Sequence, residues 1–525
     1  MRILRFFGSA KGKDSGFYMM TAGNLLAIVL TLYRQMKIAG FFGLSWQTDV
    51  FAIALVLPLL IREVVSHTID ASLIPAYSRV MARQGPDRAA VFLNRIATWI
   101  ALTTGIFCIA LLAGSDSLIS LISPGLRPME RVLASRMMRI LVPMIFLSTL
   151  SGIIVSICNY QRRFGLTALI KIAEVGSSLA FILLFSGTMG IMVLPYSVLT
   201  GSATLLIALL YISGRLRISY RPSLSTRGPE FRRFVMVALP LFLGAFVLGS
   251  AAVVDKAMAS LLGEDSITAM DYALKIHNTL LTTLILPMAV VSNVSFADFF
   301  SRKDMKGFRE EIGKLSTWTM LLTLPVTAAL IVLSTPLISV LFQRGAFSAV
   351  DSRLVGGVLA FYAPWFLGFS ISTILTRAFY AMQHSITPVL LELWGMVVNV
   401  LLNVILMPSM GVRGLALGTS IASLLKTMLM LYFLRKRTGH LGGRLIVPDM
   451  LKAAAGAGLL LGSLLLLQHF FPFDTGASIV SRGVYLLGFA FTGGAVYAVS
   501  LMLLRSVPAG ILLQRFRRRG TSNKG

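Results

Sequence analysis

The feature that most limits the fold of this chain is a series of long apolar windows, separated by short breaks that contain charged residues, glycine or proline. Each window is long enough to cross a bilayer as a helix, for which about 20 mostly apolar residues suffice. Hydrophobic residues make up 56% of the chain and charged residues only 13%, against about 25% charged residues in a soluble protein. We therefore expect an all-α polytopic membrane protein, and an ordinary soluble enzyme is excluded.

Fourteen transmembrane helices are predicted. Their windows lie at 17–40, 48–76, 92–114, 134–158, 166–186, 190–213, 234–262, 267–298, 315–343, 352–382, 386–407, 411–434, 449–470 and 480–506. No small-residue cleavage site follows the first window, so we interpret it as a span and not as a removable signal peptide. Cys108 and Cys158 both lie in apolar windows, so neither a disulfide framework nor a cysteine metal cluster is expected.

Basic residues are concentrated at the N-terminus and in every second connection, except for the short link that holds only His384. The largest clusters are Arg2, Arg5, Lys11 and Lys13; Arg215, Arg217, Arg221, Arg227, Arg232 and Arg233; Arg302, Lys303, Lys306 and Arg309; Arg435, Lys436, Arg437 and Arg444; and Arg515, Arg517, Arg518 and Arg519. The positive-inside rule makes these segments and both termini cytoplasmic, which requires an even number of spans. Because the clusters are short and lack interleaved aromatic residues, no nucleic-acid partner is expected.

The chain also contains an internal repeat. Thr98-Trp99 recurs as Thr317-Trp318, Ser115 as Ser334, Gly125 as Gly345, Tyr160 as Tyr380, and Thr167 as Thr387, at offsets of 219 or 220 residues. Helices 1 to 6 thus duplicate helices 7 to 12, and both copies start on the same side of the membrane, as in transporters built from parallel repeats. We predict two pseudo-twofold six-helix lobes, 1–215 and 216–436, and a segment 437–525 with two extra helices and a basic cytoplasmic tail.

Several charged residues lie inside the predicted spans, where they are costly and therefore candidates for function. Arg34, Arg62 and Lys275 lie well inside helices that would flank a cavity between the lobes. Such a cavity would be net cationic and would suit a phosphorylated or otherwise anionic substrate, because guanidinium groups match phosphate oxygens. The alternative is that these cations only pair with Glu63, Asp70 or Asp271 to lock helices together.

The sequence also resembles a known family. The residues that carry the resemblance are Phe42-Gly43, Thr48-Asp49, Leu57-Pro58 with Arg62, Ile74-Pro75, Val254-Asp255-Lys256, Tyr272-Ala273, the segment Leu341-Phe342-Gln343-Arg344-Gly345-Ala346-Phe347, Phe379 to Gln383, and Thr387-Pro388. These stretches resemble the MurJ/MviN family of lipid II flippases over about residues 17–435. The resemblance implies the fold of the multidrug/oligosaccharidyl-lipid/polysaccharide exporters, in which two extra helices form a groove for a polyprenyl tail.

Carried over by position, the resemblance makes Arg34, Arg62, Lys275 and Asp49 the substrate-binding residues. Arg34 and Arg62 correspond to cavity arginines of the family, and Asp49 corresponds to its acid in helix 2. Lys275 stands where the family usually has arginine, and lysine is a point charge instead of a bidentate fork. Other departures are Gln35, where the family has an acid, and Ala27-Ile28, where it has a serine and an arginine.

The resemblance also implies a sodium site in some family members, which would map to Asp255, Asn399, Asn403 and Thr419. Asn399 and Asn403 are four residues apart and so share a helix face. Two amides, a hydroxyl and a carboxylate would suit a small hard cation, but polar contacts that hold helices together explain these residues as well. Sodium is the only cofactor implied.

We interpret the chain as a lipid II flippase that moves this lipid-linked peptidoglycan precursor from the cytoplasmic to the outer leaflet by alternating access. It is expected in the bacterial inner membrane, as a monomer with a polyprenyl-diphosphate-linked glycopeptide as its partner. No catalytic constellation or P-loop indicates an enzyme or an ATP-driven pump. The alternatives are a flippase for another polyprenyl-diphosphate-linked glycan, a membrane glycosyltransferase or ligase, and a multidrug exporter.

Overall fold

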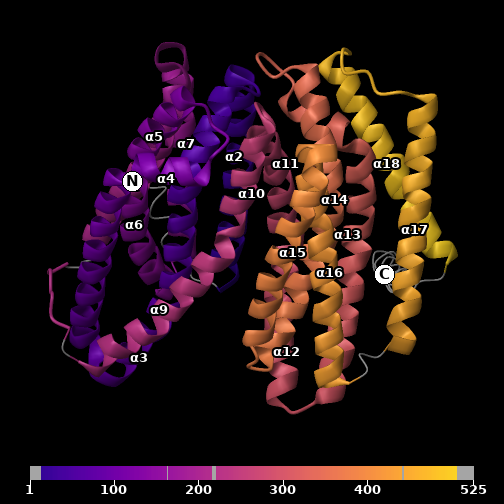
Figure 1. Cartoon of the computed structure of the whole chain (residues 1–525). Helices are drawn as coiled ribbons and strands as arrows, with labels where there is room; N and C mark the ends of the chain where they lie inside the picture. Colours follow the sequence, from indigo (N-terminus) through magenta and orange to yellow (C-terminus); the bar gives the residue numbers. More distant parts are fainter. Residues whose placement is uncertain (1–12, 162, 216–219, 227, 440–442, 505–525) are drawn as a thin grey trace, which may run out of the picture. The chain divides into compact units, whose positions relative to one another are not determined.

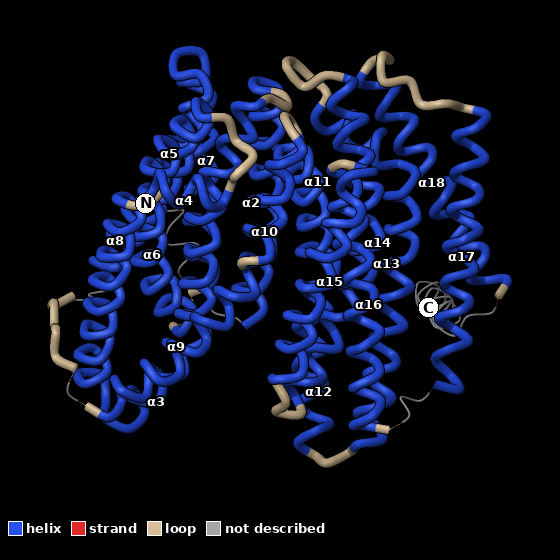
Figure 2. The backbone as a smooth tube through the Cα atoms, viewed as in Figure 1, coloured by secondary structure: helices blue, strands red, loops and turns tan. Residues whose placement is uncertain are grey.

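The computed structural model describes residues 13–161, 163–215, 220–226, 228–439 and 443–504. Within these ranges the chain is helical, with connecting turns and no strand (Figure 2). The predicted all-α class is therefore confirmed. The basic residues of 1–12, together with Arg162, Arg217, Arg227 and the predicted cytoplasmic tail at 505–525, lie outside the described residues.

The helices form two compact units, Met1–Thr268 and Ala269–Gly525. The elements of the first unit are α2 (Lys13–Phe42), α3 (Trp46–Ala113), α4 (Ser115–Ile122), α5 (Pro128–Leu141), α6 (Pro143–Tyr160), α7 (Phe164–Met189), η1 (Gly190–Met192), α8 (Val193–Arg215), α9 (Pro229–Gly249), α10 (Ala251–Ala259) and η2 (Ser260–Leu262). The chain then enters α11 (Ser266–Leu280), which continues into the second unit.

The longest element, α3, turns back on itself in the middle. Its 68 residues are interrupted at Gly85, which has φ 80° and ψ 176° and is followed by Pro86. A positive φ is readily adopted by glycine and strained for other residues, and proline cannot continue a helical hydrogen-bond ladder. The sequence Gly-Pro thus divides α3 into two arms that pack side by side.

The core of the first unit joins both arms of α3 to α6 and α9. Leu73 and Ile96 come from the two arms, Ile157 from α6 and Phe234 from α9, and all four are buried. The rings of Phe92 and Phe234 meet edge to face, with 6.4 Å between their centroids. α2 packs against α7, and α7 packs against α8 (Figure 1).

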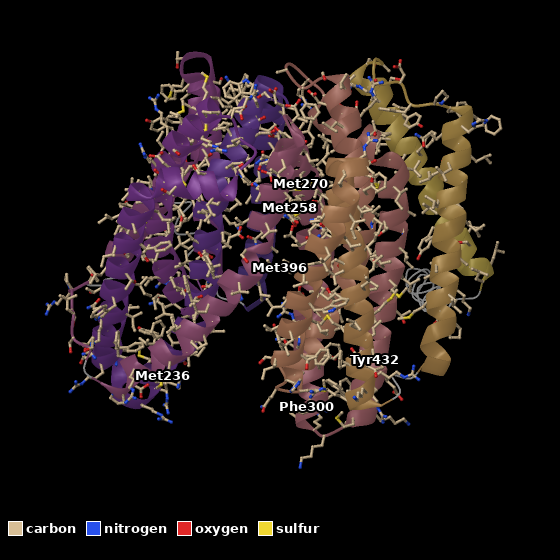
Figure 3. All side chains as sticks on the ribbon, viewed as in Figure 1. Met236, Met258, Met270, Phe300, Met396 and Tyr432 are labelled. Carbon is tan, nitrogen blue, oxygen red and sulfur yellow. The ribbon has the colours of Figure 1, made fainter. Side chains whose placement is uncertain are left out.

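The second unit is a helical bundle built around α14. Its elements after α11 are the π-helical turn η3 (Leu281–Ile285), α12 (Leu286–Ser301), α13 (Met305–Phe342), α14 (Ala349–Ala381), α15 (Ile386–Met410), α16 (Val412–Thr438), α17 (Gly443–Phe470) and α18 (Ile479–Leu503). α14 packs against α12, α13 and α16, while α17 and α18 pack against each other and against α13 (Figure 1). Phe300 of α12 and Tyr432 of α16 lie at the same end of this bundle (Figure 3).

Twelve continuous stretches of the described chain are long and apolar enough to cross a membrane. Two of them are long enough for two crossings of about 20 residues each: Trp46–Ala113 has 68 residues and Gly165–Gly214 has 50. The second of these contains α7 and α8, with the turn η1 between them. The expectation of a polytopic helical membrane protein is therefore confirmed, and the count of fourteen spans remains a prediction.

The predicted lobes, 1–215 and 216–436, describe a sequence repeat and remain a prediction. α9 and α10, the first helices after residue 216, pack against α3 within the first unit. The contacts between helices therefore divide the chain at a different place from the repeat.

Candidate functional site

The predicted cations of the first unit lie close together around one acidic residue. Arg34 belongs to α2, Arg62 to the first arm of α3, and Glu174 to α7. Arg62 Nη2 lies 3.5 Å from Glu174 Oε1, and Arg34 Nη1 donates a hydrogen bond of 3.1 Å to Ser178 Oγ. Arg34 is also within electrostatic range of both Glu174 and Arg62. One carboxylate thus serves two guanidinium groups.

Two glycines allow the helices around this cluster to approach closely. A Cβ atom on Gly23 of α2 would lie 2.6 Å from Cβ of Ala168 in α7. A Cβ atom on Gly201 of α8 would lie 3.0 Å from the carbonyl oxygen of Glu174. Small residues at such crossings let helix backbones pack closely in a membrane, and here they fix α7 between α2 and α8.

The cluster leaves one buried guanidinium donor unsatisfied. Glu174 is near both guanidinium groups and Glu63 also interacts electrostatically with Arg62, yet the Nε atom of Arg34 is buried without an acceptor among the described residues. A buried donor that lacks an acceptor is costly. A phosphate group would supply acceptors in the geometry that guanidinium forks prefer. The arrangement is therefore suited to an anion with several oxygen atoms.

The closest acid to Arg62, Glu174, is not among those that sequence reasoning proposed for helix locking. Glu63, the next residue on α3, also interacts electrostatically with Arg62, but a pair within one helix cannot lock two helices together. Asp70 instead accepts a hydrogen bond of 2.7 Å from Ser156 Oγ. The role of Glu174 was missed because it depends on the tertiary fold; its position inside a predicted span was the available signal.

Asp49 makes a structural contact in the first unit. Its side chain is buried, and its Oδ1 atom accepts a hydrogen bond of 2.7 Å from the backbone N–H of Thr268. Thr268 is the third residue of α11, so the carboxylate caps the positive end of that helix. The expected contact of Asp49 with substrate remains a prediction.

Lys275 lies on α11 in the second unit, beside an aromatic cluster. Its Nζ atom lies 4.8 Å from the ring centroid of Tyr272. The Tyr272 ring contacts Phe342 and Phe347, at 4.9 and 5.5 Å between centroids. These two phenylalanines belong to the segment that is most specific in the family resemblance, so this segment supports the helix that carries Lys275.

The same segment also connects α13 to α14 and to the end of the α17–α18 pair. Gln343 accepts hydrogen bonds from the hydroxyls of Ser339 and Ser352, and its Nε2 atom donates to the carbonyl oxygen of Thr475 at 2.8 Å. Arg482 of α18 donates to Ser339 Oγ at 2.7 Å. The sequence alone contains no signal for this contact of Arg482, because it depends on how α18 packs on α13.

Three of the four residues of the predicted sodium site form a hydrogen-bonded chain in the second unit. Asn403 donates to Asn399 Oδ1 at 3.2 Å, and Asn399 donates to Thr419 Oγ1 at 2.9 Å. The fourth residue, Asp255, lies on α10 in the first unit. Each amide oxygen has two lone pairs, so one oxygen can accept a hydrogen bond and still face a cation. The neutral oxygens therefore fit a hard cation.

The described residues contain no group of three or more His, Cys, Asp or Glu side chains that would hold a metal ion. The described residues therefore offer no set of ligands typical of a transition-metal centre. A cation site here would have to be built mainly from neutral oxygen ligands, as in the Asn399, Asn403 and Thr419 chain.

Comparison with known sequences links the chain to one family. The family profile described as "Lipid II flippase MurJ" matches residues 38–482. A protein named "Probable lipid II flippase MurJ" from Buchnera aphidicola subsp. Acyrthosiphon pisum is 28% identical, over 78% of this chain and 81% of its own. Another protein of that name, from Bdellovibrio bacteriovorus, is 26% identical over 85% of this chain and 86% of its own.

Solved structures give the same fold. A structure titled "Lipid II flippase MurJ, inward closed conformation" superposes with a TM-score of 0.80 at 21% identity, over 93% of this chain and 99% of its own. An inward-facing multidrug transporter of the MATE family and MOP superfamily has a TM-score of 0.67 at 15% identity, over 79% of this chain and 95% of its own.

The shared carboxylate predicts an order of stability among two isosteric variants. Glu174→Gln removes the carboxylate that both arginines share and leaves Arg34 without its acidic neighbour, whereas Arg62→Gln leaves Arg34 and Glu174 as one cation and one anion. Breaking a buried ion pair so that a charge is left uncompensated costs about 3 to 5 kcal/mol; partial exposure of Arg62 and Glu174, at 33% and 16%, reduces this figure. Glu174→Gln should therefore lower the thermal unfolding midpoint of the purified protein more than Arg62→Gln does. The reverse order would show that Glu174 does not serve both arginines.

Proposed function

The chain belongs to the lipid II flippase MurJ family, and from that premise we propose that it moves lipid II from the cytoplasmic to the outer leaflet of the membrane. It acts as a transporter and not as an enzyme. The lipid carries a diphosphate between its polyprenyl tail and its glycopeptide, so an anionic group must pass through an apolar layer. The protein therefore has to offer this anionic group a cationic path. In alternating access, the two lobes open this path first to one side of the membrane and then to the other.

The observation that carries this proposal is the cluster of Arg34 and Arg62 around Glu174, in which the Nε atom of Arg34 is buried without an acceptor among the described residues. That donor and the guanidinium group of Arg62 suit a diphosphate. Glu174 limits the strength of binding, because a carrier that binds an anion must also release it. Lys275 is proposed as a third substrate cation, contributed by the second unit, and Asp49 as a positioning residue.

A second candidate substrate is another polyprenyl-diphosphate-linked glycan. Lys275 in place of the family's arginine, and Ala27-Ile28 in place of its serine and arginine, weaken a bidentate diphosphate clamp. Two other classes fit the site less well. A glycosyltransferase or ligase would need a catalytic acid in a sizeable outer loop, and an exporter of organic cations would need an acidic cavity.

The proposed topology has fourteen spans in the bacterial inner membrane, with both termini in the cytoplasm. It is supported by the two long helical stretches, each of which has the length of two crossings. The basic connections then all lie on the cytoplasmic side. The functional form is proposed to be a monomer.

Sodium is proposed to bind at Asp255, Asn399, Asn403 and Thr419 and to help reset the empty carrier. The hydrogen-bonded chain of the three neutral residues supports this, because their oxygens are already gathered. The carboxylate of Asp255 would add the negative charge that balances the ion.

Topology can be tested by cysteine labelling in a variant that lacks Cys108 and Cys158. Thr188 lies near the turn between α7 and α8, and Gln84 lies at the turn of α3; both are exposed. In intact cells, an impermeant thiol reagent should label Thr188→Cys and leave Gln84→Cys unlabelled until the cells are opened. If Thr188→Cys also reacts only after the cells are opened, the 50-residue stretch does not cross the membrane twice as proposed.

The ion site can be tested by thermal unfolding of the purified protein with sodium or potassium. Sodium should raise the unfolding midpoint of the wild type, and Asp255→Asn should reduce that shift because it removes the charged ligand. Asp271→Asn serves as a control for the loss of an intramembrane carboxylate. Equal shifts in sodium and potassium for all three proteins would favour a purely structural role for the asparagines.

Transport can be tested by replacing the lipid II flippase of a cell that depends on it and measuring growth and labelled lipid II in the outer leaflet. Arg62→Ala should abolish transport, because a phosphate that loses a charge-assisted hydrogen bond loses about 1.5 to 3 kcal/mol. Lys275→Arg should be tolerated and Lys275→Glu should fail. The amount of folded protein must be measured in parallel, since loss of transport at normal abundance supports a substrate role. Full transport by the triple alanine variant of Arg34, Arg62 and Lys275 would refute it.

A further inference from the structure

A cavity of about 340 Å³ lies inside the first unit, between the two arms of α3 and α9. Its walls are mainly branched and aromatic side chains, among them Ile69, Phe107 and Phe242. Its volume falls within the range of about 300–1,000 Å³ that is typical of small-molecule sites. None of the residues of the arginine cluster lines it, so it is separate from the proposed substrate site.

The few polar side chains at the cavity offer little to a polar ligand. Three of its four hydroxyl residues are Thr68, Ser72 and Thr103. Their hydroxyls donate to carbonyl oxygens one turn earlier on α3, those of Val64, Thr68 and Trp99, at 2.8, 2.6 and 2.8 Å. Three of the four hydroxyls are thus satisfied by the walls of the cavity, and a cavity with so few free polar groups suits an apolar ligand.

The cavity opens on the surface of the first unit. Phe107, Val235 and Leu239 line it and are 40%, 41% and 55% exposed. In a bilayer this surface meets lipid tails, which are as apolar as leucine. A hydrocarbon chain is therefore the ligand class that both the walls and the opening favour.

The end of the cavity near the start of α9 is basic. Arg232 is exposed and precedes Val235 and Leu239 by three and seven residues, so it borders the same helix face. An added Cβ on Gly228, the N-cap of α9, would lie 3.3 Å from Nη1 of Arg95. The first N–H groups of a helix lack partners within the helix and carry partial positive charge.

The same end is lined with aromatic residues that are typical of the head-group level of a membrane. Trp99 donates from Nε1 to the carbonyl oxygen of Leu224 at 3.3 Å, and its ring centroid lies 6.3 Å from that of Phe231. The hydroxyls of Thr98 and Tyr220 are 2.9 Å apart. Tryptophan and tyrosine are enriched where a membrane meets water, which places the arginines at the depth of lipid phosphates.

We propose that this cavity binds one hydrocarbon chain of an anionic phospholipid, whose phosphate lies at Arg232 and the N-terminus of α9. A cavity of this size holds part of one chain, which suits a two-chain lipid whose second chain remains in the bilayer. The site is distinct from the substrate cluster and concerns a second lipid, so it stands whichever glycan is transported. Glu230, the acid in the first turn of α9, lies two residues before Arg232 and faces another side of the helix.

The test uses the purified full chain in detergent with phosphatidylglycerol or phosphatidylcholine of identical chains, and measures lipid retention by native mass spectrometry. Phosphatidylglycerol should be retained in preference to phosphatidylcholine. Arg232→Gln should weaken its retention about fivefold, the contribution of one basic residue near an anionic lipid. Arg233→Gln is the matched control, because Arg233 is also exposed but shares a helix face with Met236 and Val237, which do not line the cavity.

A second measurement tests the cavity itself, and its wild-type arm needs no substitution. Phosphatidylglycerol with a photoreactive group on one chain should label wild-type peptides that contain Ile69, Phe107 or Phe242, and Ala238→Phe should reduce that labelling by filling the cavity. Equal retention of both phospholipids, or equal loss in Arg232→Gln and Arg233→Gln, would overturn the proposal. So would labelling spread evenly over the apolar surface, or displacement of the phospholipid by a polyprenyl diphosphate at equal concentration.

Discussion

In the hydrocarbon layer every backbone N–H and carbonyl group must find a partner inside the protein, and this constraint governs the whole structure. It makes each span a helix, and it removes the hydrophobic effect as a force between helices, because lipid tails are as apolar as the side chains they would replace. Helices must then be joined by close backbone approach and by polar contacts. Gly23 against Ala168 is an example of the first kind. The carboxylate of Asp49 on the N–H of Thr268 and the ion pair of Lys426 with Glu392, at 2.7 Å, are examples of the second.

The same constraint separates charges that hold the fold from charges that serve a ligand. Lys426 is buried and matched by one carboxylate, and its Nζ atom also lies 5.8 Å from the centroid of the Phe369 ring. That arrangement balances in charge and needs nothing further. Arg34 and Arg62 share Glu174, and Glu63 also interacts with Arg62, but the Nε atom of Arg34 is buried without an acceptor among the described residues. This unsatisfied donor, more than the mere presence of charge in a span, argues for a substrate.

The fold was predictable because apolar windows and Gly-Pro breaks are local signals. The window at 267–298 corresponds to α11, η3 and α12 over 266–301, although the π-helical turn within it has no sequence signature. Tertiary pairings were not predictable. Arg62 and Glu174 are far apart in the chain, and only the tertiary fold of the first unit brings them together. The cap between Asp49 and Thr268 joins residues 219 apart, which is also the offset of the internal repeat.

A lipid-linked substrate has a charged head and a long tail, so a protein that moves it must coordinate the movement of the head with that of the tail. In the second unit one short segment connects the helices proposed to contact these two parts of the lipid. Phe342 and Phe347 pack on Tyr272, beside Lys275 of α11. Gln343, between them, binds the carbonyl oxygen of Thr475 in the link from α17 to α18, and Ser339 accepts a hydrogen bond from Arg482. In the proposed function, Lys275 contacts the diphosphate and the α17–α18 pair accompanies the tail. A shift of α11 would therefore be transmitted through this segment to the helices along the tail.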